Sequence, residues 1–123
     1  MRIFKNKPFD RFARKERIGD EALRDAVARA GRGQVDADLG GGVIKQRVAR
    51  PGQGRSGGFR TLVLLRAGER AVFAYGFAKS DRGNIREDEL VALRALAAEL
   101  LGYDDEELAK AVAAGALIEV TDG

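Results

Sequence analysis

Four basic residues of this 123-residue chain are spaced so that a β-sheet would bring them together. Lys45 and Arg47 alternate along one strand-like run, which places both side chains on one face, roughly 7 Å apart. Arg60 lies at the start of the next such run, and Lys79 follows the third. Like charges on neighbouring strands repel, so a polyanion is their natural counterpart, and arginine holds phosphate with paired hydrogen bonds. We therefore expect a phosphate-binding surface on this sheet.

Three further arginines flank these strands. Arg50 and Arg55 lie in or beside a Gly-rich connection over residues 51–58, and Arg82 follows Lys79 in a loop. We expect these three to contact the backbone of a bound nucleic acid rather than its reacting bond. A solvated surface explains the same residues about as well, with Arg60 and Lys79 paired to Asp36, Asp38 or Asp81. Periodicity does not say which sheet face is open, so both interpretations stand.

Composition excludes several classes of enzyme. The chain has no Cys and no His, which removes thiolate chemistry, disulfides, the commonest zinc ligand and the commonest general base. No nucleotide-binding glycine motif is present, and the acidic run 104–107 fits a helix N-terminus better than a metal site. Tyr75 fits the core better than a catalytic role. We expect no metal and no cofactor.

Charge is divided unevenly along the chain, although the net charge is only +3. Residues 1–60 carry 15 basic and 7 acidic side chains, whereas residues 61–123 carry 7 and 12. A concentrated positive region attracts polyanions whatever the total charge. An Arg-rich coding bias would produce the same count on an ordinary surface.

The elements that must position these residues follow from apolar spacing and from cap and turn residues. Asp20 is expected to cap the second helix, and Asn84 with Glu87 to begin the third. The expected elements are a short strand or extended arm at 3–4, helices at 8–17 and 20–30, strands at 43–50, 59–66 and 71–78, helices at 84–102 and 104–115, and a closing strand or extended tail at 116–120.

This order, β-α-α-β-β-β-α-α, predicts one α+β domain over residues 1–123. We expect helices packed on one side of a twisted, mainly antiparallel sheet. The longest apolar run, 71–78, is far too short to cross a bilayer, and the N-terminal residues contain no apolar stretch of the kind that signals secretion. A cytoplasmic protein is the expectation.

Three segments taken together resemble a known family. The stretch Gly40-Gly41-Gly42-Val43-Ile44-Lys45-Gln46-Arg47-Val48, then Gly57-Gly58-Phe59-Arg60, then Gly76-Phe77-Ala78-Lys79 with Asn84-Ile85, resembles the RelE/HigB-like toxins of bacterial type II toxin–antitoxin systems. The Ile-Phe-Lys start and the acidic C-terminal helix are similar to a short cytosolic RelE-like subgroup. The similarity covers nearly the whole chain.

The resemblance implies a microbial-RNase-like fold and cleavage of mRNA in the ribosomal A site, which a cognate antitoxin holds in check. Residue by residue, it implies that Lys45, Arg47, Arg60 and Lys79 act in catalysis and that Arg82 binds RNA. It also implies an antitoxin of the helix-turn-helix class. The sequence is compatible with a homodimer but contains nothing that requires one.

One departure from the family leaves the activity open. Many relatives have a Tyr or His near the C-terminus for proton transfer, where this chain reads Asn84-Ile85-Arg86. Lys45, brought toward neutrality by nearby arginines, is then the candidate base. Two other functions remain: a non-enzymatic gyrase inhibitor of the ParE kind, and a non-toxic module that binds nucleic acid or a protein. Phe73, Phe77 and the C-terminal helices could offer a partner apolar surface or form core.

Overall fold

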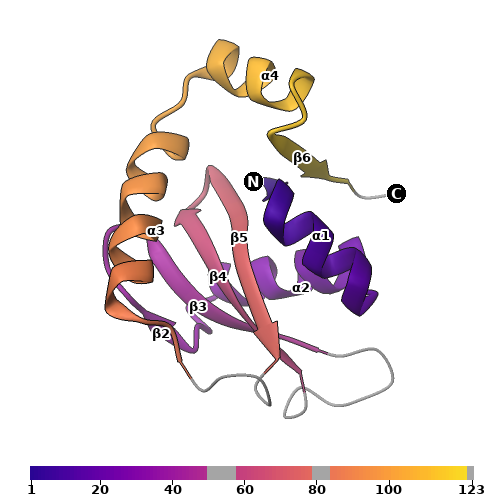
Figure 1. The fold of residues 1–123 in the computed structure, drawn as a ribbon, viewed down its shortest axis with the longest axis vertical. Helices are drawn as coiled ribbons and strands as arrows, with labels where there is room; N and C mark the ends of the chain where they lie inside the picture. The colour runs from indigo at the N-terminus through magenta and orange to yellow at the C-terminus, as the bar shows by residue number, and fades with distance from the viewer. Residues whose placement is uncertain (50–57, 79–83, 122–123) are drawn as a thin grey trace.

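A single six-stranded sheet joins both ends of the chain (Figure 1). The computed structural model describes residues 1–49, 58–78 and 84–121. Four of the predicted site residues, Arg50, Arg55, Lys79 and Arg82, lie outside these ranges. The described elements are β1 (Arg2–Asn6), α1 (Lys7–Glu16), α2 (Asp20–Gly31), β2 (Ala37–Asp38), β3 (Val43–Val48), β4 (Phe59–Arg66), β5 (Arg70–Ala78), α3 (Glu87–Leu100), α4 (Asp105–Ala113) and β6 (Leu117–Val120).

The strand order is β2-β3-β4-β5-β1-β6, and every pair except one is antiparallel. Strands β3, β4 and β5 form the expected meander. Strand β1 lies parallel to β5, and β6 pairs with β1 at the far edge. The C-terminal segment is therefore a strand rather than a free tail. The α+β class is confirmed, with two short edge strands added to the predicted order.

Helices cover both faces of this sheet, so the expectation of one covered side holds only for α1 and α2. These two pack with Val63 and Phe73 on one face, while α3 and α4 pack with Leu62 and Leu64 on the other. The reason lies in the central strands, whose consecutive apolar residues present buried side chains to both faces. Phe73 and Phe77 are 0% and 4% exposed, so they belong to the core and offer a partner no surface.

The helix ends differ from the prediction at both expected caps. Helix α2 is capped by Gly19, and Asp20 lies within its first turn. Helix α3 is capped by Arg86, whose main-chain N–H donates to Glu89 in a capping box, so the helix begins later than residue 84. The capping box that opens α4 lies in the acidic run 104–107, where a helix N-terminus is expected. Local propensity alone does not fix which of several polar residues takes the cap position.

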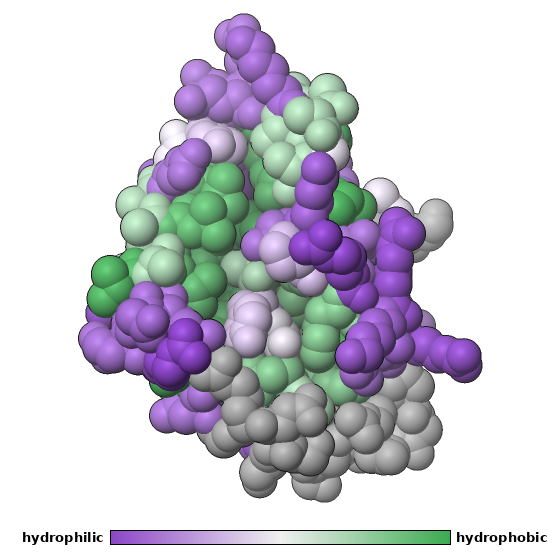
Figure 2. All heavy atoms as spheres, in the orientation of Figure 1, coloured by the Kyte–Doolittle hydropathy of each residue, from purple (hydrophilic) through white to green (hydrophobic). Residues whose placement is uncertain are grey.

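Figure 2 shows how polarity is distributed on the face seen in Figure 1. Apolar side chains occupy the middle of this view, between α3 and α1, and polar ones gather on α4 and along α1. The first turn of α4 contains Asp105, Glu106 and Glu107. The acidic end of the molecule is thus far from the basic residues of β3 and β4, which lie at the opposite end of the sheet.

Candidate phosphate-binding site on strands β3 and β4

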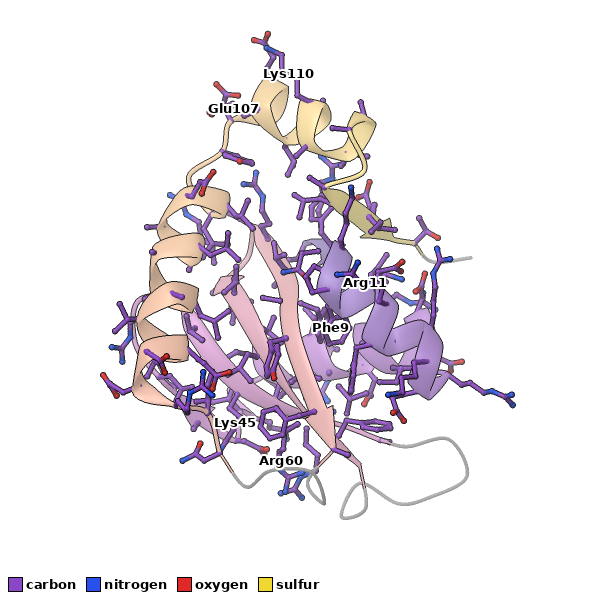
Figure 3. All side chains as sticks on the ribbon, in the orientation of Figure 1. Phe9, Arg11, Lys45, Arg60, Glu107 and Lys110 are labelled. Atoms are coloured by element: carbon purple, nitrogen blue, oxygen red, sulfur yellow. The ribbon has the colours of Figure 1, made fainter. Side chains whose placement is uncertain are left out.

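Strand register brings three of the predicted residues onto one face of the sheet. Arg47 lies directly opposite Arg60, and Lys45 lies opposite Leu62, the next residue of β4 on that face. Figure 3 shows Lys45 and Arg60 at the same end of the sheet. Tyr75 pairs with Leu62 from the other side and packs against the core beside Phe77, as expected of a core residue. Two strands therefore supply the described cationic groups.

Gly58 and Phe59 explain why Arg60 is held in this place. A Cβ atom at Gly58 would lie 2.2 Å from the carbonyl oxygen of Val48, so only glycine lets the start of β4 approach the end of β3 this closely. Phe59 is fully buried and its ring meets Phe12 of α1 edge-on at 5.4 Å between centroids. Because side chains alternate along a strand, burying Phe59 under α1 directs Arg60 to the opposite face.

A hairpin between β2 and β3 positions the acidic neighbour of these arginines. Gly40, Gly41 and Gly42 all have positive φ angles, from 63° to 86°, which glycine adopts without strain. Arg94 of α3 donates from Nε to the carbonyl oxygen of Leu39 at 3.1 Å and packs along the glycines. The hairpin is thereby fixed to the helix that covers this face.

Asp36 lies just before β2, between the two guanidinium groups. Its Oδ2 atom is 3.9 Å from Nε of Arg47 and 3.9 Å from Nε of Arg60, too far for a hydrogen bond to either. Within the described part of the chain, Nε of Arg47 and Nη1 of Arg60 are buried and have no hydrogen-bond partner. Buried donors in folded proteins nearly always have a partner. The part of the chain that the structure describes therefore leaves one donor of each arginine unsatisfied, and both donors lie beneath the surface.

Arg29 of α2 holds the edge of the sheet beside Arg47, and its own charge is paired with Asp25. Its side chain is 10% exposed, and it donates from Nη2 to the carbonyl oxygen of Arg47 at 2.6 Å and from Nε to Asp25 at 3.1 Å. Strand β2 is only two residues long and pairs with Ile44 and Lys45, so its pairing with β3 does not extend to Arg47. The guanidinium of Arg29 satisfies a carbonyl that would otherwise be open on this edge.

An open pocket of about 450 Å³ lies at this edge. It is lined by Arg29, Gln34, Val35, Asp36 and Arg47, and a volume of this size suits a small ligand or one nucleotide of a longer chain. Arg47 has 35% of its side chain exposed and Asp36 has 27%, so a ligand in the pocket can reach both. Arg60 is much less accessible, with 11% of its side chain exposed.

The arrangement suits the binding of a phosphodiester. Lys45, Arg47 and Arg60 share a face, Arg29 lies at its edge, and the carboxylate of Asp36 offsets only part of their charge. A low-dielectric setting strengthens the attraction of such donors for an anion, above all for one that gains charge during a reaction. Among the described residues, no group of three or more acidic side chains is placed to hold a metal ion.

Comparison with known proteins gives a family for this architecture. The model of the RelE toxin of the RelE/RelB toxin–antitoxin system matches residues 1–120. The chain belongs to the RelE toxin family. No curated protein and no solved structure gives a significant match.

Membership of the RelE family establishes the broad role of the protein. RelE toxins belong to toxin–antitoxin systems and pair with a cognate antitoxin. None of the helices in the described ranges combines the length and apolar character needed to cross a bilayer. The family match confirms the resemblance drawn from the glycine, lysine and arginine motifs.

The structure adds two residues that the sequence did not assign to the site of this RelE-family chain. Arg29 lies three residues after Ala26 on the buried face of α2, and this spacing was the signal that could have placed it against the sheet. Asp36 was considered only as an ion-pair partner of Arg60, which its position supports in part. Its equal distance from Arg47 depends on strand register, which the sequence alone does not specify.

Proposed function

We propose that this RelE-family protein is an endoribonuclease that cleaves mRNA on the ribosome. The observation that carries the proposal is the pair of arginines facing each other across β3 and β4. Each has a buried N–H group without a partner in the described part of the chain. The Arg47 side chain is 35% exposed and lines the open pocket beside this pair, so a phosphate oxygen in the pocket can accept a hydrogen bond from its guanidinium. Charged hydrogen bonds of this kind are about twice as strong as neutral ones.

Cleavage at a ribose phosphate needs a group that stabilises new charge. The 2′-oxygen attacks phosphorus, and the pentacovalent transition state has more negative charge on its equatorial oxygens than the starting diester has. Arg47 and Arg60 stabilise that charge, and removing one such donor from an enzyme typically costs about 10²–10³ in rate. Lys45 adds a third cation on the same face. Lys79 and the RNA contacts of Arg50, Arg55 and Arg82 stay predictions.

Dependence on the ribosome follows from what the chain lacks. It contains no histidine, so the side chain most used for acid–base catalysis is absent. Holding the RNA in a reactive geometry can supply much of a rate enhancement without it. The ribosomal A site holds a short stretch of mRNA in a fixed conformation, which suits a protein that binds phosphate and has no histidine. A helix-turn-helix antitoxin would then control the protein in the cell.

Inducible expression in a bacterium, with mapping of mRNA 5′ ends, tests this function. We expect growth arrest, new 5′ ends inside translated regions, and relief by co-expression of the antitoxin. Arg47→Met and Arg60→Met should abolish both arrest and cleavage. Arg66→Met is the matched control, because Arg66 lies at the other end of β4 and pairs with Glu69. Arrest with intact mRNA and damaged DNA would instead indicate a gyrase inhibitor.

A further inference from the structure

Asp36 is a carboxylate inside a cationic site, and its geometry is unlike that of an ordinary ion pair. Carboxylate and guanidinium groups usually approach to about 2.7–2.9 Å, often through two parallel hydrogen bonds. Here Oδ2 stays 3.9 Å from both Arg47 and Arg60, while a buried N–H group of each arginine remains without a partner in the described ranges. The Asp36 carboxylate is close enough for electrostatic attraction to both arginines but too far to accept a hydrogen bond from either Nε.

Hydrogen bonds of the main chain keep Asp36 in this position. Its N–H donates to the carbonyl oxygen of Lys45 at 3.1 Å and lies 3.3 Å from Oε1 of Gln46. Gln46 is itself buried, and its Nε2 donates to the carbonyl oxygens of Ala26 and Gln34, both at 2.9 Å. The segment before β2 is thus tied to α2 and β3 through one buried amide. These bonds fix the main chain from which the Asp36 carboxylate projects.

We propose that Asp36 is the general base that removes the proton of the attacking 2′-hydroxyl; this rests on the ribonuclease function proposed above. A carboxylate accepts a proton directly, whereas a lysine ammonium or a guanidinium has no acceptor site. Asp36 also lines the same pocket as Arg47, so a phosphate held there by Arg47 brings its ribose near the carboxylate. The proposal gives Asp36 the role of base, for which the sequence makes Lys45 the candidate.

The reaction balances without any further reagent. Asp36 takes the proton from the 2′-hydroxyl, the 2′-oxygen forms a bond to phosphorus, and the bond from phosphorus to the 5′-oxygen breaks. The leaving 5′-oxygen takes a proton from solvent, and Asp36 then returns its own proton to solvent. The products are a 2′,3′-cyclic phosphate and a 5′-hydroxyl end. Arg47 and Arg60 hold the charged oxygens throughout.

Single-turnover cleavage of mRNA on programmed ribosomes, with the purified full chain, tests the role of Asp36. We expect Asp36→Asn and Asp36→Ala to cleave about 100-fold more slowly than the parent, a loss typical of a missing general base. Ribosome binding should be unchanged or tighter, because a negative charge has been removed. Asp38→Asn is the matched control, since Asp38 is exposed, lies two residues away and accepts from the N–H of Gly40 at 3.0 Å.

Formate separates a base from a structural carboxylate. It should restore part of the cleavage by Asp36→Ala, where the side chain leaves room, at an ionic strength matched with chloride. A rate for Asp36→Asn within about threefold of the parent would overturn the proposal, as would a loss explained wholly by weaker ribosome binding. Lack of rescue by formate would also overturn it. If the parent chain itself leaves ribosome-bound mRNA intact, the proposed function fails, which distinguishes the two failures.

Discussion

Replacing Arg60 by methionine should stabilise the fold while it removes the activity. The Arg60 side chain is 11% exposed, lies 3.9 Å from Asp36, and has a buried Nη1 without a hydrogen-bond partner in the described ranges. An unsatisfied buried donor costs about 1–3 kcal/mol, and buried ion pairs can be replaced by apolar side chains at little cost or with a gain. Methionine fills a similar volume without a polar group.

The charge terms largely cancel in this substitution. Removing Arg60 removes its attraction to Asp36, and it also removes its repulsion from Arg47, which lies opposite it on the neighbouring strand. Asp36 keeps Arg47 as a partner at the same distance. What remains is the relieved desolvation, a gain of about 1–3 kcal/mol, which corresponds to a rise in Tm of roughly 3–10 °C for a chain of this size.

Thermal unfolding followed by circular dichroism measures this shift. Arg70→Met is the matched control, because Arg70 is also on a central strand but its Nη1 donates to the carbonyl oxygens of Leu100 at 2.8 Å and Tyr103 at 3.2 Å. That control should lower the Tm, since charged hydrogen bonds contribute about 1.5–3 kcal/mol. A Tm for Arg60→Met below that of the parent would instead show that Arg60 is a structural ion-pair partner whose loss destabilises the fold.

Two further predictions concern stability alone. Gly58→Ala should lower the free energy of unfolding, measured in urea, by about 1–3 kcal/mol. The added Cβ would lie 2.2 Å from the carbonyl oxygen of Val48 and would push β4 away from β3. An unchanged free energy of unfolding would contradict this. Arg2 holds the pKa of Glu119 below its usual value of 4.5 through hydrogen bonds of 2.9 Å. The contribution of this ion pair to the stability of the fold is therefore present above pH 4.5 and is lost as the pH falls through the lowered pKa. Glu119→Gln should therefore lower the Tm at pH 7 and change it little at a pH below the lowered pKa of Glu119. An equal change in Tm at both pH values would contradict the ion pair with Arg2.

The strands of the site could be predicted because their residues alternate and their ends are marked. Runs rich in Val, Leu and Phe, separated by glycine and turn residues, are typical of a meander, and the positions of Lys45, Arg47 and Arg60 followed from it. The pairing of Arg47 with Arg60 required the register. Gly58 and the buried ring of Phe59 set that register through close packing. These contacts join segments that are distant in the sequence, so the alternation of residues along the strands does not predict them.

The remaining features of the site depend on contacts between distant segments. Asp36 acquires its position from a buried glutamine that joins α2 to β3, and no local pattern around residue 36 predicts that bond. The covering of the second sheet face by α3 depends on how consecutive apolar residues of β4 are divided between two cores. The parallel placement of β1 likewise follows from its long-range pairing with β5.

We propose that the face formed by β3 and β4 cleaves mRNA held by the ribosome. One experiment compares the purified protein on ribosomes programmed with mRNA and an empty A site, on the same mRNA alone, and on DNA gyrase. We expect cleavage of the ribosome-bound mRNA, with a 2′,3′-cyclic phosphate at the new end, and no cleavage with Arg47→Met. Intact ribosome-bound mRNA together with inhibition of DNA supercoiling would contradict it.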